Sequence, residues 1–228
     1  MALLFIFGAN APLWWAMQRV TSATAALLSA TLSFWIVLFD WWAPGGKRPA
    51  LRVLAGLAMG FAGLVWLVYA GSPSEHKDFE WIGPLAIIFG MMCWGWASIF
   101  SKRLKPVGGL VLTAGANMLV GSVPVLVLGL WMGEGQKLNF HNVPLLTWVS
   151  FFYQVLICSA LAQPVYFWLL RSARSTTVAT YPFVVPVVAF ILGWITGDEF
   201  ITWQKIGAGI VIIFSAVLAM SEQWGEKK

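Results

Sequence analysis

Polar side chains recur at helical spacing inside apolar stretches of this sequence, and they are the first candidates for chemistry. The amides Asn10, Asn117 and Gln163 each carry hydrogen-bond donors and acceptors. Asn10 and Trp14 are four residues apart, and Gln163 and Tyr166 are three apart, so each pair shares one face of a helix. Polar groups are costly in apolar surroundings unless they find partners. These faces are therefore the first candidates for binding a substrate.

Aromatic residues near these amides are candidate walls of the same site. The predicted substrate-binding set contains Asn10, Trp14, Trp94, Asn117, Gln163, Tyr166 and Tyr181. A structural role is the alternative for each member, because amides also hydrogen-bond between packed helices and aromatic rings fill the space between them.

Four prolines lie within or beside these stretches and predict kinks or hinges. Each proline removes a backbone donor and obstructs the preceding helical turn. In a bilayer, neighbouring helices and side chains satisfy the carbonyl groups that a proline leaves unpaired. The predicted kink or hinge positions are Pro12, Pro164, Pro182 and Pro186.

The elements that position these residues follow from composition. The chain has 228 residues, of which 60% are hydrophobic and only 10% are charged, and its mean hydropathy is +0.80. Soluble domains are nearer 45–50% apolar and about 25% charged. The sequence therefore predicts an all-α integral membrane protein whose first partner is the lipid bilayer.

Membrane-spanning helices need about 20 apolar residues. The sequence predicts about eight transmembrane helices, over 2–18, 22–42, 50–70, 80–101, 108–132, 144–170, 176–196 and 204–222. Ten of the 14 lysines and arginines fall in one set of alternate loops with the C-terminus, and four in the other. Cytoplasmic loops are enriched in basic residues. Both termini are therefore predicted to be cytoplasmic, in a multi-pass protein of the inner membrane.

The first three predicted helices align with the last three at an offset of about 152 residues. Pro12 then falls on Pro164, and Arg19 on Arg171. The two copies enter the membrane from opposite sides. Inverted repeats of this kind are typical of secondary transporters.

Several stretches resemble the EamA-type repeats of the drug/metabolite transporter superfamily. They are "TSATAALLSATLSFWIVLF", "WIGPLAIIFGMMCWGWASIFSKRL" and "YFWLLRSARSTTVATYPFVVPVVAFILGWITGDE". The resemblance implies a bundle of two inverted five-helix repeats, of which this sequence lacks the equivalent of the first two helices. The expected plan is 3+5 of 5+5 helices: three helices from the first five-helix repeat, followed by all five helices of the second. Residues 1–70 would form a partial first repeat, and residues 80–222 a complete second one.

The resemblance implies a secondary transporter that moves small organic metabolites, such as amino acids, by alternating access. The predicted spans contain acids only at or near their ends, where Asp40 lies near the end of the span over 22–42, and this pattern favours a neutral or zwitterionic substrate. A degenerate or partial transporter acting as a non-transporting membrane subunit is the alternative, and a homodimer is possible.

Other function classes lack their signatures. No Ser/His pair, H-E-x-x-H motif or paired acid lies within the predicted spans, so an enzyme is not expected. Cys93 and Cys158 lie in apolar segments and are expected to pack as thiols. For the same reason no metal site is expected at these cysteines, and no cofactor is expected. No nucleic-acid partner is expected either, because the basic residues form no stripe.

Overall fold

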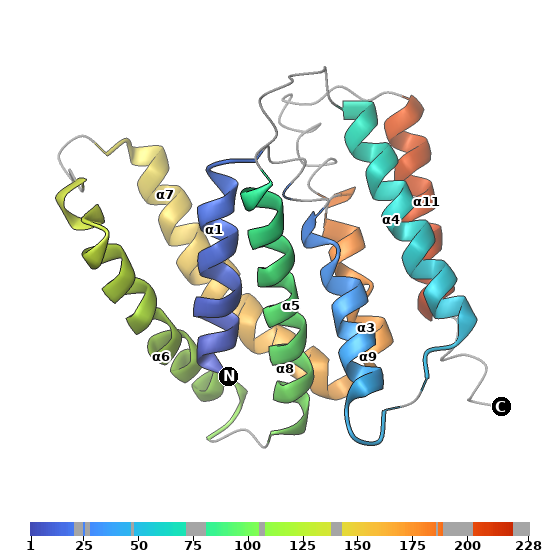
Figure 1. Cartoon of the computed structure of the whole chain (residues 1–228), viewed down its shortest axis with the longest axis horizontal. Helices are drawn as coiled ribbons and strands as arrows, with labels where there is room; N and C mark the ends of the chain where they lie inside the picture. Colours follow the sequence, from blue (N-terminus) through green and yellow to red (C-terminus); the bar gives the residue numbers. More distant parts are fainter. Residues whose placement is uncertain are drawn as a thin grey trace.

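The computed structural model describes residues 1–20, 25, 28–46, 48–71, 81–104, 108–137, 143–185, 187–188 and 203–220. The described residues form a helical bundle and contain no strand (Figure 1). Met1 and the last residues of α11 (Trp203–Met220) lie at the same end of the bundle. Pro186 lies outside the described residues.

The first part of the chain contains three apolar helical segments. A π-helix, η1 (Leu3–Asn10), continues directly into α1 (Ala11–Met17), as the predicted span over 2–18 requires. Helix α3 (Leu32–Trp42) and helix α4 (Leu51–Gly71) follow.

The second part begins with two long helices, α5 (Ile82–Arg103) and α6 (Leu110–Trp131). A short 3-10 turn, η2 (Glu134–Lys137), follows α6. Then α7 (Leu145–Tyr153), the π-helix η4 (Gln154–Leu161) and α8 (Ala162–Ser172) run on without a break. The short helix α9 (Ser175–Val178) precedes α11.

Three helices of the described part are long and apolar enough to cross a membrane: Ile82–Arg103, Leu110–Trp131 and Leu145–Ser172. Four shorter apolar helices accompany them. Large apolar side chains cover much of the outer surface, and no residue in the most apolar window of Leu145–Ser172 is buried. Such a surface suits lipid rather than water. The protein is a multi-pass membrane protein, and the count of eight spans stays a prediction.

Glycines allow α4 and α11 to pack closely along their lengths (Figure 1). A Cβ atom at Gly56 would lie 2.9 Å from the backbone nitrogen of Ala219, and one at Gly60 would lie 2.7 Å from Ser215 Oγ. Small residues permit this approach of two backbones in membrane proteins. Gly56 and Gly60 therefore pack against α11 within the chain.

The two π-helices occupy matching places in the aligned segments. Ala11 donates its backbone N–H to Ile6 O, and Ala162 donates to Ile157 O, so both bonds span five residues rather than four. Pro12 and Pro164 follow these widened turns. A proline leaves the carbonyl four residues earlier without its usual donor, and a π-turn is one way to accommodate this change.

The predicted helix over 176–196 is interrupted in its described part. Helix α9 ends at Val178, Ala179 and Thr180 form a turn, and helical structure resumes at residues 181–185. Thr180 donates both its backbone N–H and its hydroxyl to Thr177 O, at 3.1 and 2.8 Å. Pro182 is buried directly after this turn. The interruption falls beside the proline, which has no N–H with which to continue the helix.

Candidate functional site

A closed set of hydrogen bonds joins α5 to α8 inside the bundle. Trp94 donates its indole N–H to the Tyr166 hydroxyl at 3.2 Å. The Tyr166 and Ser98 hydroxyl oxygens lie 2.7 Å apart, and Ser98 Oγ donates to Trp94 O at 2.7 Å. Because Ser98 has a single hydroxyl hydrogen, Tyr166 donates to Ser98. Each of the three donors is therefore used, which is the condition for polar groups to be stable away from water.

Aromatic rings surround this set, which we call the Tyr166 cluster (Trp94, Ser98, Tyr166 and Tyr181, with Phe5). The Phe5 ring is fully buried and packs edge-on against Trp94, at 5.5 Å between centroids. The Tyr181 ring lies 5.7 Å from that of Tyr166, also edge-on. Edge-to-face pairs are favourable arrangements for aromatic rings. The cluster thus joins η1, α5, α8 and the segment after the turn at Ala179–Thr180.

Three of the seven predicted substrate-binding residues meet in this cluster: Trp94, Tyr166 and Tyr181. Gln163 lies one turn before Tyr166 on α8 and is buried, with 9% of its surface exposed. The fold therefore brings aromatic and hydroxyl groups together with one amide nearby.

The other three predicted residues are placed differently. Asn10 donates its side-chain amide to Phe5 O at 2.8 Å, and Asn117 donates to Thr113 O at 2.8 Å, so both bond to their own helices. Trp14 is 51% exposed on the outer surface. No contact that the structure gives connects Asn10, Asn117 or Trp14 with the hydroxyls of the Tyr166 cluster.

The predicted hinge prolines are likewise distributed over several elements. Pro12 is in the first turn of α1, and Pro164 is in the first turn of α8. Pro182 is buried beside the Ala179–Thr180 turn, within one residue of Tyr181.

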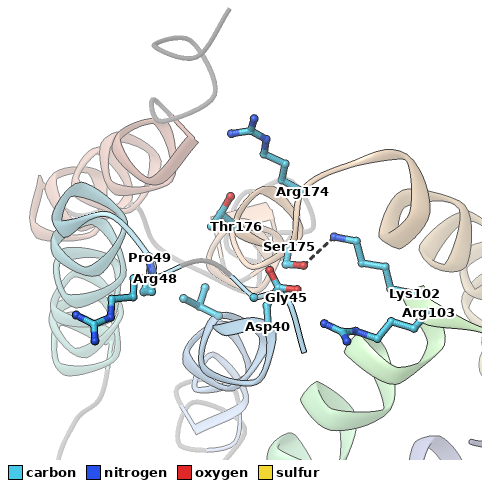
Figure 2. Close-up of a pocket in the computed structure, with 11 residues that line it drawn as sticks. Asp40, Gly45, Arg48, Pro49, Lys102, Arg103, Arg174, Ser175 and Thr176 are labelled. Carbon is cyan, nitrogen blue, oxygen red and sulfur yellow. Dashed lines mark hydrogen bonds between the residues drawn. The ribbon is translucent and has the colours of Figure 1, made fainter. Parts of the chain in front are cut away.

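A second polar feature is a cavity of about 320 Å³ at the end of the bundle where α3 and α5 end (Figure 2). Its lining includes one acid and four basic residues: Asp40, Arg48, Lys102, Arg103 and Arg174. In the sequence, Asp40 lies near the end of a predicted span, and the basic residues predict the orientation of the helices. Their spacing along the chain gives no sign that the fold gathers them.

Phe5 and Ser98 also gain importance from the fold. Phe5 lies in an apolar segment without any polar signal, and Ser98 is one of many serines in the predicted spans. Their common contact with Trp94 and Tyr166 depends on packing between helices. Cys93 is a buried free thiol and Cys158 is partly buried, and the described residues contain no group of His, Cys, Asp and Glu that could hold a metal ion.

Comparison with known proteins relates the sequence to a family. Residues 81–221, more than half of the chain, match the EamA-like transporter family. The chain is 30% identical over 207 residues to the uncharacterized inner membrane transporter YedA of Escherichia coli K12, with 88% of this chain and 62% of that protein covered. It is 25% identical over 223 residues to the uncharacterized transporter YvbV of Bacillus subtilis, with 96% and 71% covered.

One solved crystal structure has the same fold. It aligns with a TM-score of 0.78 at 21% identity, over 96% of this chain and 74% of that one. The chain spans 62% of the length of YedA, so it corresponds to part of that relative.

Proposed function

Because the chain belongs to the EamA-like transporter family, we propose that it is a secondary transporter of small organic metabolites in the inner membrane. Relatives named as transporters align over 88% and 96% of the chain, which supports this role. Amino acids are the first substrates to test. The Tyr166 cluster, with Gln163, is the proposed binding site.

The observation that carries the proposal is the set of hydrogen bonds at Tyr166. Intramembrane polar groups are costly, and this set places a phenol, an indole and a serine hydroxyl on two facing helices. A substrate with its own donors and acceptors can replace these bonds one for one. The exchange would open the contact between α5 and α8 without leaving any polar group unsatisfied.

The proposed substrate is neutral or zwitterionic. The cluster consists of aromatic rings and hydroxyls, and none of its members carries a formal charge. A site for an inorganic cation or a strongly charged metabolite would need a counter-charge at this depth.

Alternating access is proposed to occur between two inverted repeats, 1–70 and 80–222. The family match over 81–221 coincides with the second unit. The paired π-helices before Pro12 and Pro164 support an equivalence between the units. The turn at Ala179–Thr180 is the proposed hinge, because it lies directly beside Tyr181 and Pro182.

The end of the bundle that contains Met1, Lys102 and Arg103 is proposed to face the cytoplasm. Lys102 and Arg103 lie in the last turn of α5 at that end, and basic residues favour the cytoplasmic side.

Transport by the purified chain in proteoliposomes tests the proposal. Vesicles loaded with a panel of amino acids should lose one or a few of them faster than protein-free vesicles. A variant with Tyr166→Ala, folded as shown by its melting curve, should lose this acceleration. Absence of movement for every metabolite, with protein that is folded and inserted, would favour the non-transporting subunit instead.

A further inference from the structure

The cavity at the end of α3 and α5 is a candidate ligand site separate from the Tyr166 cluster. It lies between α3, residues 45–46 and 48–49, the end of α5 and the start of α9 (Figure 2). Its volume of about 320 Å³ is sufficient for a small organic headgroup. The cavity therefore connects parts of both proposed repeats.

Its depth is that of the membrane surface. Trp41 and Trp42 directly follow Asp40 at the end of α3 and are 39% and 63% exposed. Exposed tryptophans at helix ends are typical of the headgroup region. Lipid phosphates lie at this level, so the cavity is within their reach.

The charge of the lining is strongly positive. The described lining residues include four cations, Arg48, Lys102, Arg103 and Arg174, and one carboxylate, Asp40, so among them the formal surplus is three positive charges, 4 minus 1. Figure 2 shows Lys102 and Arg103 extending from α5 toward the other lining elements, whereas Arg48 and Arg174 extend outward. The long side chain of Arg48 can rotate toward an anion.

Hydroxyl groups complete the lining. Lys102 Nζ donates to Ser175 Oγ at 3.0 Å, and Ser175 is only 2% exposed. Thr176 Oγ1 is buried and has no hydrogen-bond partner among the described residues. A buried hydroxyl without a partner is unfavourable. An acceptor in the cavity would satisfy it.

We propose that this cavity binds a phosphate group, carried either by the headgroup of an anionic phospholipid or by a soluble phosphate. Phosphate offers several acceptor oxygens and accepts paired bonds from arginine, so it can use cations from several elements at once. The ligand would link α3 and residues 45–46 and 48–49 to α5 and α9. This proposal concerns binding and does not depend on transport.

Binding by the full chain in nanodiscs tests the proposal. The nanodiscs contain phosphatidylcholine, and a fluorescent phosphatidylglycerol or inorganic phosphate is titrated in separate arms. We expect saturable binding in at least one arm. Arg103→Gln should weaken it about fivefold, the effect of one basic residue near a membrane surface. Thr176→Val, which removes the unpaired hydroxyl and keeps the shape, should also weaken it.

Arg52→Gln is the matched control, because Arg52 is exposed in the first turn of α4 at the same end but is not part of the lining. It should bind as the unchanged protein does, and Arg103→Lys, which keeps the charge but not the paired bonds, should retain more affinity than Arg103→Gln. Binding of lipid that inorganic phosphate displaces assigns the site to a headgroup, whereas binding of phosphate alone assigns it to a soluble anion. Non-saturable binding in both arms, or equal loss in Arg52→Gln and Arg103→Gln, would overturn the proposal.

Discussion

The hydroxyl oxygens of Tyr166 and Ser98 lie 2.7 Å apart, although the two residues are separated by 68 positions in the chain. The pair forms because α8 and α5 pack against each other and against Phe5 of η1. It places two hydroxyls and an indole N–H at one point inside a membrane protein. The stability of the chain and its proposed transport activity should therefore both depend on it.

Tyr166→Phe should destabilise the protein by about 1 kcal/mol, because Trp94 loses its acceptor and Ser98 loses its donor. Chemical or thermal unfolding in detergent measures this free energy. Tyr153→Phe is the control, since Tyr153 is 59% exposed on α7 and its loss should change stability by less than about 0.5 kcal/mol. Equal effects of both variants would mean that the hydrogen bonds at Tyr166 contribute nothing measurable.

Gln163→Ala should raise the KM for the transported metabolite by about fivefold to tenfold, the loss of roughly one hydrogen bond. Gln163 is buried one turn from Tyr166, whereas Gln154 on the same long helix is exposed. Gln154→Ala is therefore the matched control and should leave KM unchanged. Initial rates in proteoliposomes provide the measurement, and unchanged KM in Gln163→Ala would remove this residue from the proposed site.

Pro182→Ala should slow transport severalfold, because the new N–H can donate to Val178 O and extend the helix through the Ala179–Thr180 turn. Hydrogen exchange at residues 177–181 should become slower in the same variant. Pro124 lies inside α6, which continues past it, so Pro124→Ala should not slow transport. A Pro182→Ala protein with full turnover would exclude this turn as the moving part.

Gly56→Ala should destabilise the protein by about 1–3 kcal/mol, because its Cβ would press on the backbone of α11 at 2.9 Å from Ala219 N. Gly115 in α6 has no atom within 4 Å of its added Cβ. Gly115→Ala should therefore be neutral or stabilising by up to about 1 kcal/mol. Melting temperatures of the two variants in the same detergent compare them, and similar values would contradict the close packing of α4 and α11.

The sequence by itself determined that the chain is a helical membrane protein, and it located the described helices to within a few residues for α4, α5, α6 and α11. Apolar length and interfacial charge suffice for this, because the bilayer requires each helix to satisfy its own backbone. The family was also recognisable from sequence, since the residues that match it, 81–221, form one continuous stretch of the chain. Of the predicted helix over 22–42, the structure describes Ala25 and the residues from Leu28 onward. In that part, α3 begins at Leu32.

Only the tertiary structure decided which polar residues meet. Asn10, Asn117 and Tyr166 all lie on polar faces of apolar helices, but the two asparagines bond to their own backbones and Tyr166 bonds to another helix. Helical periodicity shows which residues share one face of a helix, but it does not show which other helix packs against that face. The cationic cavity depends likewise on packing that brings Lys102, at the end of α5, near Arg48 and Arg174, which lie outside the helices. Contacts between helices depend on the packing of many side chains at once, and spacing along one chain does not contain that information.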